Sequence, residues 1–423
     1  MIQKTKDKIF TISRKWGRKI GIDLPYFLKN GFWVAIRQLV SILCGLILSA
    51  VFARMATQEI FGQYQFILAV LSIVSILSVP GLNVSITRSV ARGYEGDYAR
   101  VVKTSFLWSL LGVPVLLLAG GYYYLYQSHG LGLALMISSV FFPFLYAPNT
   151  WDSFLQGKSR FDISAKYSSI QAILNTAVTV VVIFFSRNNL VPIVIAYLVS
   201  YTFFNGYYYF KSLKYVNNKK TDADTVSYGW FLTKVNFAAL ISANADKFLV
   251  GTLLGMESLA IYYVVSAVAL KIKDIEKSLA SFLVPKLSAD HLDVFMLLKQ
   301  KKKAVLLVSV FLFFASIVYI YLSPIVTTML FSDKYSEYSY LAKYFVVTFI
   351  LVFPGSFLVQ YIQGQKNKFA LVTHSIFFNI IRIVIYFLSI KIAGILGAVL
   401  AFNFSVIISF AFHIFGIAHK NKK

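Results

Sequence analysis

Long apolar runs occupy most of the sequence, and they constrain the fold more than any other feature. A membrane-spanning helix needs about 20 consecutive apolar residues, and runs of about this length recur from one end of the 423-residue chain to the other. In the first half they lie at 31–55, 65–82, 104–126, 131–151, 167–185 and 190–210. In the second half they lie at 229–254, 258–285, 304–331, 344–363, 369–390 and 394–417. The sequence therefore predicts an all-α integral membrane protein with about twelve transmembrane helices.

The low content of charged residues agrees with this prediction. Charged residues make up 14% of the chain, whereas a soluble domain carries roughly a quarter, and the mean hydropathy is +0.70. The single cysteine, Cys44, excludes a disulfide framework and a thiolate metal cluster. No constellation typical of a catalytic or metal site is present, so we expect neither an enzyme nor a bound metal.

The positive charges show how the chain should cross the membrane. If the N-terminus is cytoplasmic, the predicted outside segments hold only Arg187, Lys334, Lys343 and Lys391, whereas almost all other Lys and Arg lie inside. The positive-inside rule then predicts that both termini are cytoplasmic. The net charge of +24 would face anionic lipid, and because no soluble module carries it, we do not expect nucleic acid as a partner.

Composition and similarity between the halves suggest five segments. These are a basic leader (1–30), an N-terminal lobe (31–210), a cytoplasmic linker (211–228), a C-terminal lobe (229–417) and a basic tail (418–423). No cleavable signal is expected. The leader places four apolar residues at near-helical spacing among cations: Ile9, Ile12, Trp16 and Ile20. This pattern is typical of an interfacial amphipathic helix, with a disordered basic tail as the alternative.

The two halves of the chain resemble each other. MATQEIFGQY follows the first span and LLGMESLAIY follows the seventh. At one constant offset, three pairs align: Glu59 with Glu257, Gly62 with Ala260, and Tyr64 with Tyr262. A second match relates QGKSRF (156–161) to QGQKNKF (363–369), after the fourth and tenth spans. These repeats predict two pseudo-symmetric lobes of six helices in parallel orientation.

Three stretches resemble a known transporter family: FARMATQEIFGQYQFILAVLSIVSILSVPGLNVSITRSVA (52–91), ADKFLVGTLLGMESLAIYYVVSA (245–267) and VPKLS (284–288). They are similar to the polysaccharide-export branch of the multidrug/oligosaccharidyl-lipid/polysaccharide (MOP) exporter superfamily, which includes the Wzx-type flippases. The resemblance covers nearly the whole chain. It implies a bacterial inner-membrane protein whose lobes surround a V-shaped central cavity with alternating openings. It also implies flipping of a polyprenyl-diphosphate-linked oligosaccharide, such as an O-antigen or capsule repeat unit, out of the cytoplasmic leaflet.

The charged inner end of 258–285, from Lys271 onward, is assigned to a cytoplasmic segment. Five other cations lie within the predicted spans, and each would cost about 3 kcal/mol at the bilayer centre. They are Arg37, Arg54, Lys234, Lys247 and Arg382. Arg54 ends its span and should reach the interface. Arg37 and Lys234 lie at nearly equivalent positions of the two lobes, so we expect them to flank the cavity and bind an anionic headgroup, or to snorkel. Arg382 lies deep in its span and should face a wet cavity or pair with an acid.

Asp246 is the only acid expected in the core of a span. It could bridge to Arg382, or it could bind H⁺ or Na⁺ as a coupling site. Its neighbour Lys247 should not pair with it, because adjacent helical side chains point about 100° apart. Lys247 is therefore another candidate for the anionic headgroup, together with Arg37, Lys234 and Arg382.

Neutral amides could contact the sugars of such a substrate. The candidates are Gln171, Asn175, Asn379 and Asn403. Arg and Lys can replace water around phosphates, while amides hydrogen-bond hydroxyl groups. The alternative for each amide is an ordinary interhelical hydrogen bond.

Three other functions compete with a lipid-linked oligosaccharide flippase. A cation-coupled multidrug exporter would need acids in its cavity. A lipid II flippase resembles members of a family that usually has fourteen spans, whereas about twelve are expected here. A membrane glycan polymerase would need a large periplasmic loop, whereas the longest one expected here is only 332–343. Expected partners are the lipid-linked oligosaccharide, membrane lipids, a glycan polymerase and chain-length machinery, with the protein itself a monomer. No cofactor is expected beyond a coupling ion.

Overall fold

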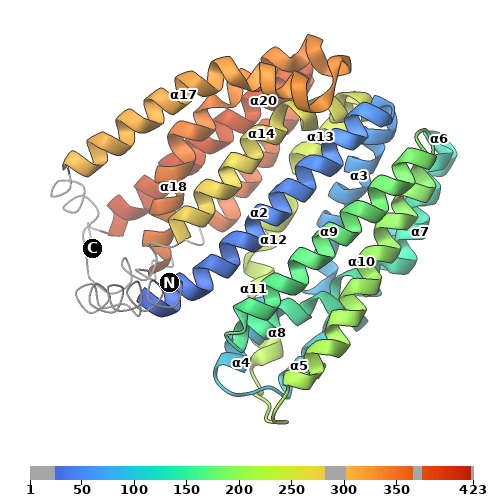
Figure 1. The fold of residues 1–423 in the computed structure, drawn as a ribbon, viewed down its shortest axis with the longest axis vertical. Helices are drawn as coiled ribbons and strands as arrows, with labels where there is room; N and C mark the ends of the chain where they lie inside the picture. Colours follow the sequence, from blue (N-terminus) through green and yellow to red (C-terminus); the bar gives the residue numbers. More distant parts are fainter. Residues whose placement is uncertain (1–23, 282–301, 365–373, 421–423) are drawn as a thin grey trace, which may run out of the picture.

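The computed structural model describes residues 24–281, 302–364 and 374–420, and all regular elements in these ranges are helical (Figure 1). Most of the leader, the VPKLS stretch (284–288) and most of the second match at 363–369 lie outside the described residues. The described part of the leader, from Leu24, belongs to the first long helix, α2. The prediction of an all-α membrane protein is confirmed by these helices.

The first half forms α2 (Leu24–Met55), α3 (Gln58–Val74), η1 (Ser75–Ser78), α4 (Gly81–Ala91), α5 (Asp97–Ser109), α6 (Gly112–Tyr126), α7 (His129–Tyr146), η2 (Pro148–Thr150), α8 (Trp151–Gly157), α9 (Phe161–Phe185), α10 (Leu190–Ser212) and η3 (Leu213–Tyr215). The second half forms α11 (Thr225–Val235), α12 (Phe237–Ser242), α13 (Ala245–Leu254), α14 (Met256–Ser281), α17 (Lys302–Phe331), η4 (Asp333–Phe345), α18 (Val346–Gly364), η5 (His374–Phe378) and α20 (Asn379–Lys420).

Within these described ranges, 9 segments are long and apolar enough to cross a membrane. They are Gly31–Met55, Gln58–Ser78, Asp97–Tyr126, His129–Gly157, Phe161–Phe185, Leu190–Tyr215, Leu306–Phe331, Asp333–Val359 and Ser375–Ile417. The seventh predicted span is instead broken into α11, α12 and α13, and the eighth corresponds to α14 with its charged end. The number of twelve stays a prediction.

The last apolar segment contains a sharp break at the position predicted between the final two spans. Ala393 and Gly394 leave the helical region, with φ of +57° at Gly394, a conformation that favours glycine. A Cβ on Gly397 would lie 1.8 Å from the Ser389 carbonyl oxygen. Two arms of α20 therefore meet closely at this break, as two successive spans would.

The two halves make close contact at the end of the molecule where α2 and α17 finish, which we call the far end (Figure 1). The Arg54 guanidinium of α2 donates to the Met329 and Leu330 carbonyls of α17. In return, the Lys334 ammonium donates to the carbonyls of Arg54 and Ala56, at 3.3 Å each. Each cation thus satisfies carbonyls that the end of the opposing helix leaves unpaired.

The opposite end, where α2 and α9 begin and α10 finishes, carries many of the cations, and we call it the basic end. Here α11, from the second half, packs on α4 of the first half. The Gly81 amide donates to Thr233 Oγ1 at 3.0 Å, and the rings of Trp108 and Trp230 meet edge to face. By contrast, α13 packs mainly on α14 and α20 of the second half, and it also touches α3 of the first half. The broken seventh span therefore connects the two halves.

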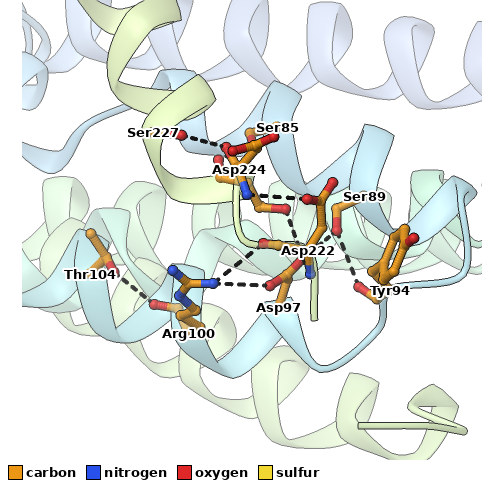
Figure 2. Close-up of polar contacts among 10 residues, drawn as sticks. Ser85, Ser89, Tyr94, Asp97, Arg100, Thr104, Asp222, Asp224 and Ser227 are labelled. Carbon is orange, nitrogen blue, oxygen red and sulfur yellow. Dashed lines mark hydrogen bonds and ion pairs between the residues drawn. The ribbon is translucent and has the colours of Figure 1, made fainter. Parts of the chain in front are cut away.

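A buried carboxylate fastens the linker to the first half at the basic end (Figure 2). Asp97 is fully buried and accepts hydrogen bonds from Ser89 Oγ, the Asp222 amide and Thr225 Oγ1. The Arg100 guanidinium lies 3.8 Å from its other oxygen. These charge-assisted bonds hold the start of α11 against α4 and α5.

The far-end contact depends on a glycine. A Cβ on Gly62 would lie only 1.7 Å from the Met256 carbonyl oxygen, so Gly62→Ala must push α3 away from the start of α14. We expect a destabilisation of about 1–3 kcal/mol, typical of overpacking. The measurement is the thermal unfolding midpoint of the purified protein in detergent. Gly206→Ala is the matched control, because nothing lies within 4 Å of its Cβ position; equal midpoints for both variants would contradict this contact.

Candidate cation-lined cavity

A cavity of about 470 Å³ lies among helices of the second half. Its walls come from α12, α14, α18, η5 and α20, together with Asn236 between α11 and α12. Its polar lining consists of Asn236, Lys273, Ser356, Ser375, Asn379, Arg382, Ser405, Ser409 and His413. No Asp or Glu is among the described residues that line it. The cavity is therefore electropositive and rich in hydrogen-bonding groups.

Arg382 is brought to this cavity by the first arm of α20. Its guanidinium carbon lies 5.6 Å from the centroid of the Tyr386 ring, one turn along the same helix, which is a cation–π arrangement. Its Nε has no hydrogen-bond partner in the described structure. Arg382 thus lies deep in its span, as predicted, and lines the wall of the cavity. Its Nε remains able to donate a hydrogen bond to a ligand.

Asp246 lies near the start of α13 and is only 2% exposed. One of its oxygens accepts a hydrogen bond from Tyr262 Oη at 3.0 Å. The other lies 3.8 Å from Lys247 Nζ, so the prediction that these neighbours cannot pair is wrong. Asp246 and Lys247 occupy the first turn of α13, and the long lysine side chain folds back there, where it also donates to Asn244 Oδ1 at 3.3 Å.

Asp246 and Arg382 do not form the direct bridge that was one of the sequence alternatives. They interact electrostatically, and the tyrosines Tyr262 and Tyr386 belong to the same buried group. The carboxylate therefore balances part of the arginine charge from within the protein, while Arg382 itself lines the cavity.

Arg37 has a partner that the sequence analysis missed. Its Nη1 lies 2.9 Å from Asp152 and also donates to Ser164 Oγ at 3.3 Å. Asp152 had been placed just beyond the fourth span, but the apolar segment His129–Gly157 includes it. Asp246 is therefore not the only acid in a span. The proximity of Asp152 to the predicted boundary was the available signal.

Lys234 has a different environment from Arg37, although the repeat aligns their positions. It is exposed on α11, and the described residues offer it no ion pair. Because α11 packs on α4 whereas α2 packs on α9, the two cations do not share equivalent surroundings. The structure thus leaves Lys234 accessible and gives Arg37 a carboxylate.

The four candidate amides separate into two groups. Gln171 donates to Asn205 Oδ1 at 2.9 Å, Asn175 to the Tyr197 carbonyl at 3.2 Å, and Asn403 to the Tyr344 carbonyl at 2.6 Å. These bonds join neighbouring elements. Asn379 donates within its own turn to the Ser375 carbonyl at 2.9 Å, and it alone of the four lines the cavity.

The cavity also contains polar groups that the sequence analysis did not select. Lys273 lies in the charged part of α14, which had been assigned to a cytoplasmic segment, and its Nζ is 4.9 Å from the centroid of the Phe402 ring. Asn236 lies at the break between α11 and α12. The charged end of the long eighth apolar run was the only sequence signal for Lys273.

Comparisons with known proteins agree with this architecture. Residues 27–291 match the model of a family described as "Polysaccharide biosynthesis protein". A curated protein of Shigella flexneri named "Putative O-antigen transporter" is 23% identical over 283 residues, which cover 62% of this chain. The match spans 66% of that relative, just under two thirds of its length.

Solved structures share the fold over nearly the whole chain. A MOP superfamily transporter from Pyrococcus furiosus aligns with a TM-score of 0.57 at 14% identity, covering 94% of this chain and 96% of that one. The lipid II flippase MurJ, in an inward closed conformation, aligns with a TM-score of 0.64 at 15% identity, covering 91% and 87%. The fold is therefore that of the MOP superfamily.

The pairing of Arg37 with Asp152 can be measured by a double-mutant cycle. The single variants Arg37→Ala and Asp152→Asn should each lower stability, because each leaves one member of a partly buried pair without its partner. The side chains are 35% and 15% exposed, so we expect a coupling free energy of about 1–2 kcal/mol. Unfolding in detergent measures it, and strictly additive effects would show that the pair contributes nothing.

Proposed function

Because the chain belongs to the polysaccharide biosynthesis protein family, we propose that it is a flippase for a polyprenyl-diphosphate-linked oligosaccharide. The substrate would be an O-antigen or capsule repeat unit, moved from the cytoplasmic to the outer leaflet of a bacterial inner membrane. Both termini would be cytoplasmic, which places the basic end at the cytoplasm. A transporter of this kind moves its substrate by alternating access and makes or breaks no covalent bond.

The observation that carries this proposal is the cationic cavity without carboxylates in its described lining. A diphosphate is an anion that cannot cross hydrocarbon unaided, and Arg and Lys are the side chains that replace its hydration. Arg382 offers a planar fork and Lys273 a point charge. Asn236, Asn379 and the serines would hydrogen-bond phosphate oxygens or sugar hydroxyls, while the prenyl tail stays in lipid.

Alternating access requires a contact that closes one side and can be released. The reciprocal bonds of Arg54 and Lys334 join α2 to the end of α17 at the far end. These bonds would hold the outer side closed while substrate enters from the basic end. Accessible Lys234, in the last turn of α11, would meet the headgroup on that path.

Three other functions remain as alternatives with less support. The cationic compounds that a multidrug exporter carries would be repelled by the cations of this cavity. A lipid II flippase would use the same cationic chemistry, and only its larger number of spans separates it from the present proposal. A glycan polymerase would need a large outer segment, and the described connection between α17 and α18 is the compact η4.

We propose Asp246 as the residue through which H⁺ or Na⁺ would act if transport is coupled. It is buried, it belongs to the same electrostatic group as Arg382, and it has an oxygen without a hydrogen bond. Loading or release of a cation there would change the charge balance felt by the cavity. A glycan polymerase and chain-length machinery are the proposed protein partners, with the flippase itself a monomer.

Arg382→Ala should reduce transport at least about tenfold, the effect of losing one hydrogen bond to a charged group. Arg382→Lys should restore part of it, because charge is kept while the fork is lost. The measurement is surface glycan display in cells that lack their own flippase, with membrane insertion checked by immunoblotting. Arg187→Ala, an exposed arginine outside the cavity, is the control. Full display by the Ala variant would remove Arg382 from the site.

Asp246→Asn tests coupling separately from substrate binding. The amide keeps the size and the Tyr262 contact but cannot be charged, so we expect transport in proteoliposomes to lose its dependence on the H⁺ or Na⁺ gradient. Tyr262→Phe, which removes only the hydrogen bond to Asp246, should keep that dependence. If the Asn variant responds to both gradients as the wild type does, Asp246 has no coupling role.

A further inference from the structure

A second hollow, remote from the cation-lined cavity, lies between α9 and α10 near the basic end. Its volume is about 560 Å³, and no residue lines both spaces. Lys166 and Lys211 line it together with a mainly aromatic wall that includes Ile170, Phe203 and Tyr207. We call it the α9–α10 groove. It combines two cations with membrane-facing apolar surface.

Lys211 is held in place by aromatic rings rather than by an acid. Its Nζ lies 5.2 Å from the centroid of the Tyr167 ring and 5.1 Å from that of Tyr207, and it donates to Tyr207 Oη at 3.1 Å. Cation–π contacts of this kind orient an ammonium without neutralising it. The charge therefore remains available to an anion.

No carboxylate balances the two lysines in the part of the chain that the structure describes. The groove has no Asp or Glu in its lining. Asp162 is near in sequence, but both its oxygens accept from Arg160, at 3.1 and 3.2 Å. Both lysines therefore contribute uncompensated charge.

The apolar part of the groove is preformed and faces outward. The stacked rings of Tyr167 and Tyr208 lie 4.4 Å apart, and Phe203 stacks on Tyr207 at 6.3 Å. Phe203 is 63% exposed and Tyr207 is 47% exposed. Along α10, Phe203 lies about 12 Å deeper than Lys211, at 1.5 Å per residue. The groove is thus cationic at the membrane surface and apolar further in.

We propose that the α9–α10 groove binds an anionic phospholipid of the leaflet at the basic end. The lipid phosphate would lie between Lys166 and Lys211, and an acyl chain would follow Ile170 and Phe203 into the membrane. A zwitterionic lipid gains less, because its own amine already compensates the phosphate. Cationic groups by themselves are common at the cytoplasmic end of a membrane protein and do not indicate a lipid site. The feature that specifies a lipid is the Lys211 ammonium, held in place beside an outward-facing aromatic groove.

The test uses the full-length protein in detergent, titrated with phosphatidylglycerol or phosphatidylcholine and followed by native mass spectrometry. The double variant Lys166→Gln/Lys211→Gln should weaken phosphatidylglycerol binding about 10- to 30-fold, the effect expected for two surface lysines. Lys219→Gln/Lys220→Gln changes the net charge equally at exposed linker positions and should leave the binding unchanged. Lys166→Arg/Lys211→Arg should retain it.

Three results of the phospholipid titrations, and a fourth from competition, would overturn the proposal. The three are equal loss of binding in the linker control, equal affinity of the wild type for both phospholipids, and undiminished binding by the Gln variant with its unfolding midpoint intact. A polyprenyl phosphate serves as the competing anionic lipid. If it displaces phosphatidylglycerol from the wild type at much lower concentration, the groove belongs to the transported carrier rather than to a bulk phospholipid.

Discussion

The energetic cost of an ionised group inside a membrane protein governs how this chain arranges its buried charges. Each such group costs about 3 kcal/mol at the bilayer centre unless a partner or water compensates it. Arg37 meets Asp152, and Asp246 meets Tyr262 and Lys247. Arg382 is different, because no acid pairs with it directly: its guanidinium lies against the Tyr386 ring, and Asp246 balances part of its charge from a longer distance. An incompletely compensated cation on a cavity wall is where an anionic ligand would gain most.

The same constraint applies to the broken seventh span. Breaks in a membrane helix are tolerated where the freed backbone groups find partners in protein or a polar cavity. Asn236, at the first break, lines the cation-lined cavity, and Asn244, at the second, donates to Ser72 of α3 at 2.7 Å. The broken span is thus held to the first half at both ends of α12: α11 is fastened by Thr233 and the buried Asp97, and the second break is fastened by Asn244.

The fold was largely predictable from sequence, because apolar runs of spanning length and the repeat between halves are long-range patterns. The break at Ala393–Gly394 falls where two predicted spans meet. Side-chain partners were much less predictable. Asp152 lay one residue past a predicted boundary, and Lys247 pairs with its neighbour because a long side chain can fold back at a helix start. The repeat aligned Arg37 with Lys234, but their environments depend on which neighbour each helix packs against, which no alignment within one chain contains.

Pseudo-symmetry in sequence therefore coexists with a division of roles between the two halves. In the first half the candidate amides Gln171 and Asn175 connect α9 to α10, which makes that half a connected unit. In the second half Arg382 and Asn379 line the cavity. A ligand bound there would press against α12, α14, α18 and α20, and α12 belongs to the broken span joined to the first half. Because α14 also packs on α3 of the first half, occupancy of the cavity would be communicated to the first half through both α12 and α14, without direct contact between the ligand and the first half.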